Sequence, residues 1–78
     1  MEILTEQLSD GRYIVVRFGD KWETGTTLFL NNANVEHAYC YGLEETLRLM
    51  DKYKVDAPEL RKRLDVLMVM KGMGYERE

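Results

Sequence analysis

Residues that could carry out catalysis are few in this chain of 78 amino acids. It holds one histidine, His37, one cysteine, Cys40, and a serine, Ser9, in a turn-like segment. A thiol and an imidazole form a nucleophilic pair only where the two side chains meet. On a strand His37 and Cys40 point to opposite faces, whereas on a helix they share one. We expect a strand over this segment, so the sequence predicts a protein that is not an enzyme.

Metal and phosphate sites are not indicated either. One His and one Cys cannot supply the four ligands of a structural zinc ion unless carboxylates or a second chain contribute. A glycine pair, Gly72 and Gly74, follows a predicted helix, whereas a phosphate-binding loop precedes one. We therefore expect no metal and no cofactor.

The basic cluster Arg61-Lys62-Arg63 could contact nucleic acid from a helix. Acidic residues interleave with it, and Glu59 stands four positions before Arg63, the spacing of an intrahelical ion pair. The net charge of −3 arises in residues 1–41, which hold six acidic and three basic residues, because residues 42–78 hold eight of each. A small nucleic-acid-binding regulator is therefore an alternative function and not the leading one.

The most informative pattern is a run of five apolar residues from Val66 to Met70 inside a predicted helix. Successive helical positions differ by about 100°, so such a run places apolar side chains all round the helix. One set forms a stripe that would cover a sheet, namely Leu60, Leu64, Leu67 and Met68. A second set falls off that stripe, namely Val66, Val69, Met70 and Met73. We expect the second set to be a dimer seam or a partner-binding surface; the alternative is a helix enclosed on all sides by its own domain.

The elements that position these residues follow from periodicity. Most of the β-branched and aromatic residues lie in positions 2–41, and the apolar residues after position 42 have helical spacing. We therefore expect one α+β domain over residues 1–78. An antiparallel sheet of three to four strands precedes two helices packed on one face. The predicted strands cover 3–8, 12–18 and 26–30, with the turn Ser9-Asp10-Gly11 between the first two. Residues 35–41 fit a fourth strand (ββββαα) or a helical extension (βββαα).

Both predicted helices carry boundary signals. The first should cover about 43–54, with an apolar stripe at Leu43, Leu47 and Met50 and with Leu49 and Tyr53 beside it. The second has Asp56 as a capping residue, Pro58 in the first turn and Glu59 in the capping-box position. It should end at Gly72 or Gly74.

Aromatic residues offer two further candidates. Trp22 lies in a polar loop between two glycines, where it could close the end of the sheet or contact a partner. Tyr13, Tyr39, Tyr41 and His37 could share the outer face of the sheet. Such a face could stack nucleobases, but aromatic neighbours on adjacent strands more often stabilise the sheet itself.

Composition limits the setting. A hydrophobic content of 45% beside 32% charged residues argues against disorder. A single cysteine allows no internal disulfide and fits a reducing compartment, and we expect neither a signal peptide nor a transmembrane segment. We therefore expect a cytoplasmic protein. So small a domain buries little of its surface, which favours oligomerisation or partner binding.

In size, acidity and lack of catalytic residues, the chain resembles the small phage or mobile-element proteins that inhibit host enzymes, anti-CRISPR proteins among them. The resemblance rests on no shared motif and assigns no residue roles. The leading hypothesis is a homodimeric protein–protein interaction module that modulates or inhibits a larger protein partner. A structural subunit of a larger assembly is a further alternative.

Overall fold

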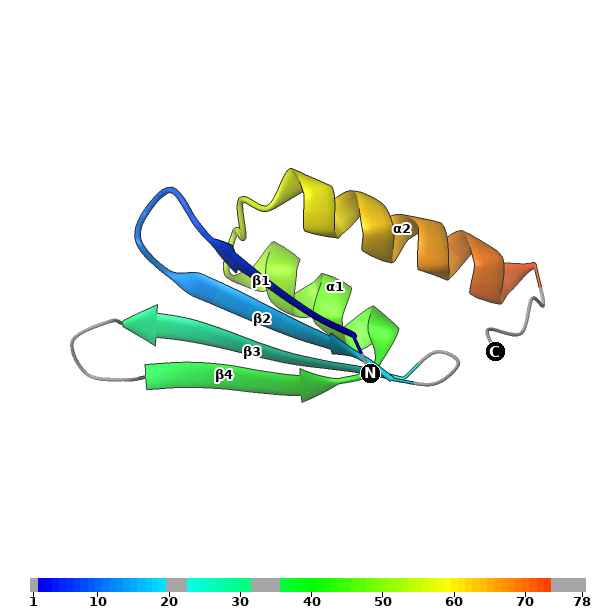
Figure 1. Ribbon diagram of the computed structural model, residues 1–78, viewed down its shortest axis with the longest axis horizontal. Coiled ribbons are helices and arrows are strands. Elements are labelled where there is room, and N and C mark those ends of the chain that lie inside the picture. Colours follow the sequence, from blue (N-terminus) through cyan, green and yellow to red (C-terminus); the bar gives the residue numbers. More distant parts are fainter. Residues whose placement is uncertain (1, 20–22, 32–35, 74–78) are drawn as a thin grey trace.

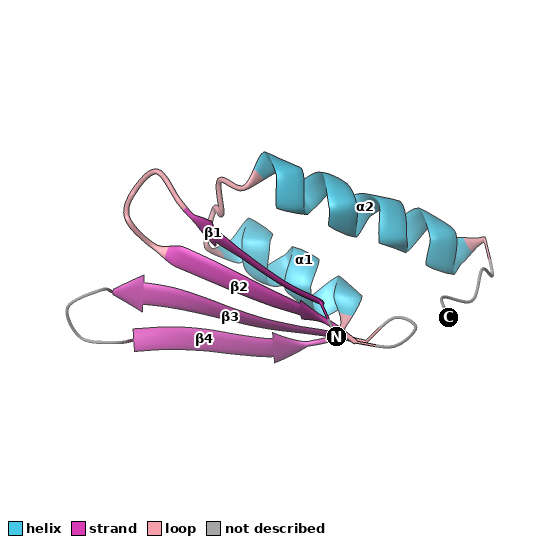
Figure 2. Cartoon of the chain, viewed as in Figure 1, coloured by secondary structure: helices cyan, strands magenta, loops and turns pink. Residues whose placement is uncertain are grey.

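A four-stranded antiparallel sheet followed by two helices forms the protein (Figures 1 and 2). This computed structural model describes residues 2–19, 23–31 and 36–73. The elements are β1 (Glu2–Gln7), β2 (Tyr13–Phe18), β3 (Thr24–Asn31), β4 (Glu36–Tyr41), α1 (Leu43–Lys52) and α2 (Pro58–Gly72). The ββββαα prediction is confirmed, and the helical alternative for residues 36–41 is wrong.

The strands follow one another as a meander in the order β1-β2-β3-β4. Gly11 closes the first hairpin with φ 93°, a conformation that glycine adopts without strain, as the turn pattern predicts. A register shift between Phe29 and Asn31 separates the regular part of the β3–β4 ladder from its start at Glu36. β1 and β4 are the edge strands within the described part of the chain.

The core lies between one face of the sheet and the two helices. Alternate residues of β2, namely Ile14, Val16 and Phe18, are buried, as is Leu28 of β3. Period-two burial of this kind is what a sheet covered on one side requires. The opposite face of the sheet is not covered by any helix in the described ranges (Figure 1).

Each helix covers a different pair of strands. In α1 the Thr46 hydroxyl lies 2.6 Å from that of Thr26 on β3 and 3.7 Å from the sulfur of Cys40 on β4. In α2 the Arg63 guanidinium binds Glu2 of β1 and stacks over Phe18 of β2, 4.4 Å from the ring centre. α1 therefore lies over β3 and β4, and α2 lies beside β1 and β2.

The buried face of α1 differs from the predicted stripe. Leu43 and Met50 are buried as expected. Leu47, which was predicted to lie in the stripe, is only partly buried, whereas Leu49, which was predicted to lie beside it, is buried. The fully buried Thr46 lies on the same face. Hydrogen bonds from its hydroxyl group make its burial possible, so an apolar pattern alone could not locate this face.

The start of α2 also differs from the prediction. Asp56 is not its capping residue: the N-cap is Ala57, with no side-chain cap, and Pro58 is the first helical residue. Asp56 instead accepts a hydrogen bond of 3.2 Å from the Ser9 hydroxyl of the first hairpin. The competing long-range partner explains the error. The predicted end at Gly72 is confirmed.

Candidate functional site

The second apolar set of α2 lies largely in solvent. The exposed fractions are 51% for Val66, 61% for Val69 and 67% for Met73, and Met70 is partly buried. The alternative of a helix enclosed by its own domain is therefore wrong. The first set behaves as predicted, because Leu60, Leu64 and Leu67 are buried and Met68 packs at the edge of the core.

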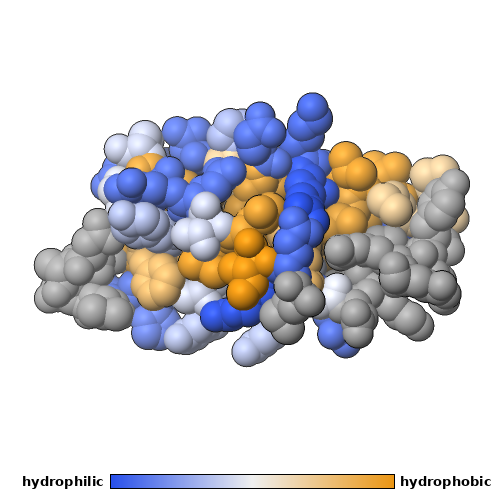
Figure 3. All heavy atoms as spheres, in the orientation of Figure 1, coloured by the Kyte–Doolittle hydropathy of each residue, from blue (hydrophilic) through white to orange (hydrophobic). Residues whose placement is uncertain are grey.

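The exposure follows from where α2 ends. Figure 1 shows that the C-terminal half of α2 extends past α1 and past the ends of the strands. In the part of the chain that the structure describes, no helix or strand covers Val66, Val69 and Met73 at this end of α2, and these side chains stay exposed. Figure 3 shows apolar residues at this end of the molecule, separated by a hydrophilic band from those on the sheet.

A shallow hollow accompanies this face. It has a volume of about 530 Å³ and is lined by one helix, through Pro58, Arg61, Lys62, Asp65, Val66, Val69 and Met70. A hollow with a single wall cannot enclose a small ligand, which binds in a pocket that surrounds most of its surface. The shape suits a protein surface that supplies the second wall. We call this second apolar set, Val66, Val69, Met70 and Met73, the α2 surface.

The basic cluster beside this surface is mostly used within the domain. Arg61 donates to Asp51 at 2.7 Å and to Asp65 at 3.4 Å, and Arg63 forms a forked pair with Glu2. The hydrogen bond that Arg61 donates to Asp51 raises the pKa of Arg61, and those that Arg63 donates to Glu2 raise the pKa of Arg63. The predicted Glu59–Arg63 pair is wrong, because Arg63 reaches β1 instead.

Two of the three cationic groups are therefore held by carboxylates. Lys62 is exposed and lines the hollow. A phosphate backbone would have to displace Asp51, Asp65 and Glu2 to reach both arginines, which weakens the nucleic-acid alternative.

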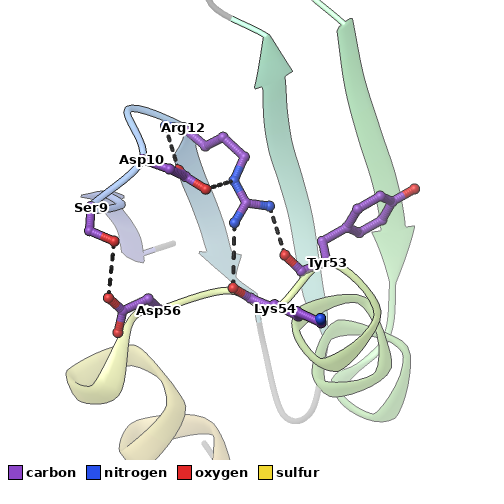
Figure 4. A network of polar contacts seen from close by, with 6 residues as sticks. All are labelled: Ser9, Asp10, Arg12, Tyr53, Lys54 and Asp56. Carbon is purple, nitrogen blue, oxygen red and sulfur yellow. Dashed lines mark hydrogen bonds and ion pairs between the residues drawn. The ribbon is translucent and has the colours of Figure 1, made fainter.

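A network around Arg12 holds the connection between the helices against the first hairpin (Figure 4). The guanidinium donates to the backbone oxygens of Tyr53 at 2.8 Å and Lys54 at 3.4 Å, and to the carboxylate of Asp10 at 2.6 Å. These carbonyls lie at the end of α1, where helical partners run out. Arg12 therefore helps to set the direction in which α2 leaves α1. Sequence reasoning missed this role, since only the fold brings residue 12 to residues 53 and 54.

The residues considered for catalysis do not converge. His37 lies on the uncovered face of the sheet and Cys40 on the face toward α1, as the strand prediction requires. Ser9 lies in the turn between β1 and β2, and its hydroxyl donates to the carboxylate of Asp56. No group of three or more potential metal-binding side chains comes together in residues 2–19, 23–31 and 36–73.

The uncovered sheet face carries the predicted aromatic residues. The register places Tyr13 beside Phe29 and Phe29 beside His37, with Tyr39 and Tyr41 further along β4. The His37 and Tyr39 rings meet edge to face at 4.5 Å. Two ring contacts on this face, Phe29 with His37 and His37 with Tyr39, stabilise the sheet there. Trp22 lies outside the described residues, so its role stays a prediction.

The sequence matches no family model, and neither curated proteins nor solved structures give a significant match. Both described helices are too short or too polar to cross a membrane.

Proposed function

We propose that this protein is a non-enzymatic interaction module that binds a larger protein through the α2 surface and thereby inhibits or modulates it. The observation that carries the proposal is the exposure of Val66, Val69 and Met73 toward the C-terminal end of α2, with the partly buried Met70 among them. Large exposed apolar surfaces on small proteins mark interaction sites.

The spacing of these residues favours one mode of binding. They stand at positions i, i+3, i+4 and i+7, the pattern by which an amphipathic helix inserts into a hydrophobic groove. Two of the four are methionines, whose flexible side chains adapt to irregular apolar surfaces. The groove would belong to the partner, and α2 would supply the inserted helix.

Size favours a larger partner over a dimer formed by this helix alone. A helix of 15 residues spans only about 22 Å. One face of it offers a few hundred Å², whereas stable complexes bury roughly 1,200 Å² or more in total. A groove that wraps around the end of α2 gains more contact area than a flat pairing of two helices.

Charged residues at the start of the surface would give the interaction its orientation. Lys62 and Asp65 lie one turn before Val66 and Val69 and are both exposed. Exposed charges beside an apolar contact steer association and fix its register more than they add affinity. A matching rim of opposite charges on the partner would therefore lie beside its groove.

Affinity capture from a lysate of the native cell tests the proposal when variants are compared side by side. We expect wild-type protein to retain a partner that Val69→Asp and Met73→Asp lose. Glu59→Ser is the matched control, because Glu59 is exposed in the first turn of the same helix and does not line the hollow. A partner retained equally by all these proteins would contradict the proposal, provided each variant unfolds at the wild-type temperature.

A further inference from the structure

The two edge strands of the sheet differ in how they are protected. β1 carries Glu2 and Glu6 on the side that faces the helices, and Arg63 of α2 binds Glu2. Charges at inward-facing edge positions discourage pairing with another strand. On β4 the corresponding positions hold Ala38 and Cys40, both partly buried. β4 contains neither lysine nor proline, and its one acidic residue, Glu36, lies at the start of the strand beside the register shift, so the edge from His37 to Tyr41 lacks these forms of protection.

The backbone of β4 has a defined set of groups that point outward. The amide of Gly42 donates to the carbonyl of Thr24 at 2.7 Å. Hydrogen-bonded pairs alternate along an antiparallel ladder, so Cys40 and Ala38 also face β3. The peptide groups of Tyr39 and Tyr41 therefore point away from the sheet. Their side chains are 63% and 80% exposed, and both rings lie on the uncovered face.

The flank of α1 above this edge is charged in a self-complementary way. Glu44 and Asp51 face α2, since they pair with Lys71 and Arg61. Glu45 comes directly after Glu44, and Lys52 directly after Asp51. Each therefore lies about 100° further round the helix, on the flank toward the β4 edge. Both are exposed. Lys52 has no ion pair within the described ranges and lies 5.3 Å from the ring of Tyr53.

We propose that β4 pairs edge to edge with β4 of a second copy of this chain, so that the two sheets form one continuous eight-stranded sheet. This inference goes beyond the proposed function, which concerns the α2 surface, and does not depend on it. Outward-facing residues must pair with outward-facing residues, and a two-fold axis at Tyr39 satisfies this requirement. Tyr39 then lies opposite the second copy's Tyr39, and Ala38 lies opposite its Cys40.

The same axis brings the two α1 helices together. Strands lie about 4.8 Å apart, and α1 lies over β3 and β4, so the two α1 axes would run about 10 Å apart, the usual packing distance. Thr46 lies over Cys40, and α1 runs back along β4. Two helical residues advance about as far as one strand residue, so the middle of α1, two residues after Thr46, lies over Tyr39. In the antiparallel helix pair Glu45 faces the second copy's Lys52, and Lys52 faces its Glu45. Backbone and charge thus select the same axis.

A proline scan of the two edges tests the proposal. Tyr39→Pro removes an amide that faces away from β3, so it spares the sheet of one chain but breaks two symmetric bonds between chains. Thr5→Pro is the matched control, because Leu8 donates to Arg12 at 2.7 Å, which makes Thr5 face outward on β1. In sedimentation we expect wild type and Thr5→Pro at twice the chain mass of 9.2 kDa. Tyr39→Pro should raise the dissociation constant by about thirtyfold.

Disulfide trapping tests the register even if Tyr39→Pro fails to fold. In the background Cys40→Ser, Tyr39→Cys places two thiols across the axis, with Cα atoms about 5.5 Å apart, within the reach of a disulfide. Tyr41→Cys places its thiols about four residues out of register, roughly 13 Å apart, where none can form. We expect the first variant, and not the second, to give a covalent dimer on mild oxidation.

Charge exchange tests the contact between the helices. Lys52→Glu should weaken the dimer by about tenfold, since two attractions become two repulsions. Adding Glu45→Lys should restore it, and Lys62→Glu on α2 should leave it unchanged. A monomeric wild-type chain at high micromolar concentration, or cross-linking at position 41 instead of 39, would overturn the proposal. If the chain proves monomeric but still captures a partner through the α2 surface, only the dimer proposal fails. If partner capture fails but the dimer forms, only the proposed function fails.

Discussion

Thr46 of α1 and Thr26 of β3 share a hydrogen bond of 2.6 Å between their hydroxyl oxygens, and both residues are almost fully buried. The Thr46 hydroxyl also lies 2.8 Å from the carbonyl of Gly42, to which it donates. One small polar group thereby joins the start of α1 to the middle of the sheet. It fixes α1 over β3 and β4, which leaves α2 to lie beside β1 and β2 and to extend beyond them.

We expect Thr46→Val to lower the free energy of unfolding by about 1–2 kcal/mol, because it leaves the buried Thr26 hydroxyl without its partner. Thr27→Val is the matched control. Among the described residues, the Thr27 hydroxyl is buried with no hydrogen-bond partner, so the change should be neutral or stabilising. Urea denaturation of both variants measures the difference. Equal losses would show that the Thr26–Thr46 bond contributes nothing specific.

Arg12→Ala should cost about 2 kcal/mol, since two carbonyls at the end of α1 lose a charged donor. Arg12→Lys should not restore the loss, because an ammonium group cannot reach several acceptors in the plane of a guanidinium. Arg17→Ala, on the exposed face of β2, should change stability by less than about 0.5 kcal/mol. Thermal unfolding followed by circular dichroism checks all three; a full rescue by lysine would contradict the forked geometry.

Lys54, two residues after the last residue of α1, has φ 51°, a left-handed conformation that favours glycine. The amides of Lys54 and Val55 turn back to the carbonyls of Asp51 and Met50, as in a Schellman motif. Lys54→Gly removes the strain of the left-handed conformation from the folded state, but it also raises the conformational entropy of the unfolded chain. The first effect is the larger, so we expect a net stabilisation of about 0.5 kcal/mol.

The contrasting variant for this site is Arg48→Gly, at an exposed position in the middle of the same helix. It should destabilise the protein by about 1 kcal/mol, because glycine has a low helix propensity. Chemical denaturation of both variants measures the two effects. Destabilisation by both would show that the left-handed conformation at residue 54 costs little.

Acid should remove a contribution of Asp10. The amide of Arg12, which donates to the carboxylate at 3.1 Å, lowers the pKa of Asp10 below its ordinary value of 3.8. The carboxylate is therefore favoured in the folded state. Its contribution is fully present above that ordinary value and is lost as the pH falls through the lowered pKa. We expect Asp10→Asn to flatten the acid limb of the stability–pH curve; an unchanged limb would exclude this contribution.

Local patterns predicted most of the fold. Strand alternation, the Gly11 turn and the burial of Leu60, Leu64 and Leu67 on α2 depend on neighbours in the chain, and each was correctly predicted. The errors occur where a distant residue competes for a group. Ser9 takes Asp56 from the helix cap, Glu2 takes Arg63 from Glu59, and Thr26 makes Thr46 part of the core.

The candidate surface was predictable for the same reason. Five consecutive apolar residues cannot all face one side of a helix, whatever the rest of the fold. The unprotected edge at β4 could not be predicted, because the strand assignment itself was open and edges depend on the strand order. The proposed dimer seam thus lies at β4 and not on the α2 surface.

The two surfaces lie on different elements at opposite sides of the sheet order, so a dimer through β4 would present two α2 surfaces. A partner with two grooves at a matching distance would then be bound more tightly than by one chain, because the second contact is intramolecular. Wild type should bind such a partner with higher avidity than Tyr39→Pro. Equal binding in surface plasmon resonance at high and low ligand density would argue against bivalent contact.

The most direct measurement is calorimetric titration of the purified captured partner with wild type, Val69→Asp and Glu59→Ser. We predict that Val69→Asp raises the dissociation constant by at least about thirtyfold, as for a central apolar anchor, while Glu59→Ser changes it by less than about threefold. Wild-type affinity in Val69→Asp, with its fold intact, would contradict the assignment of the α2 surface as the binding site.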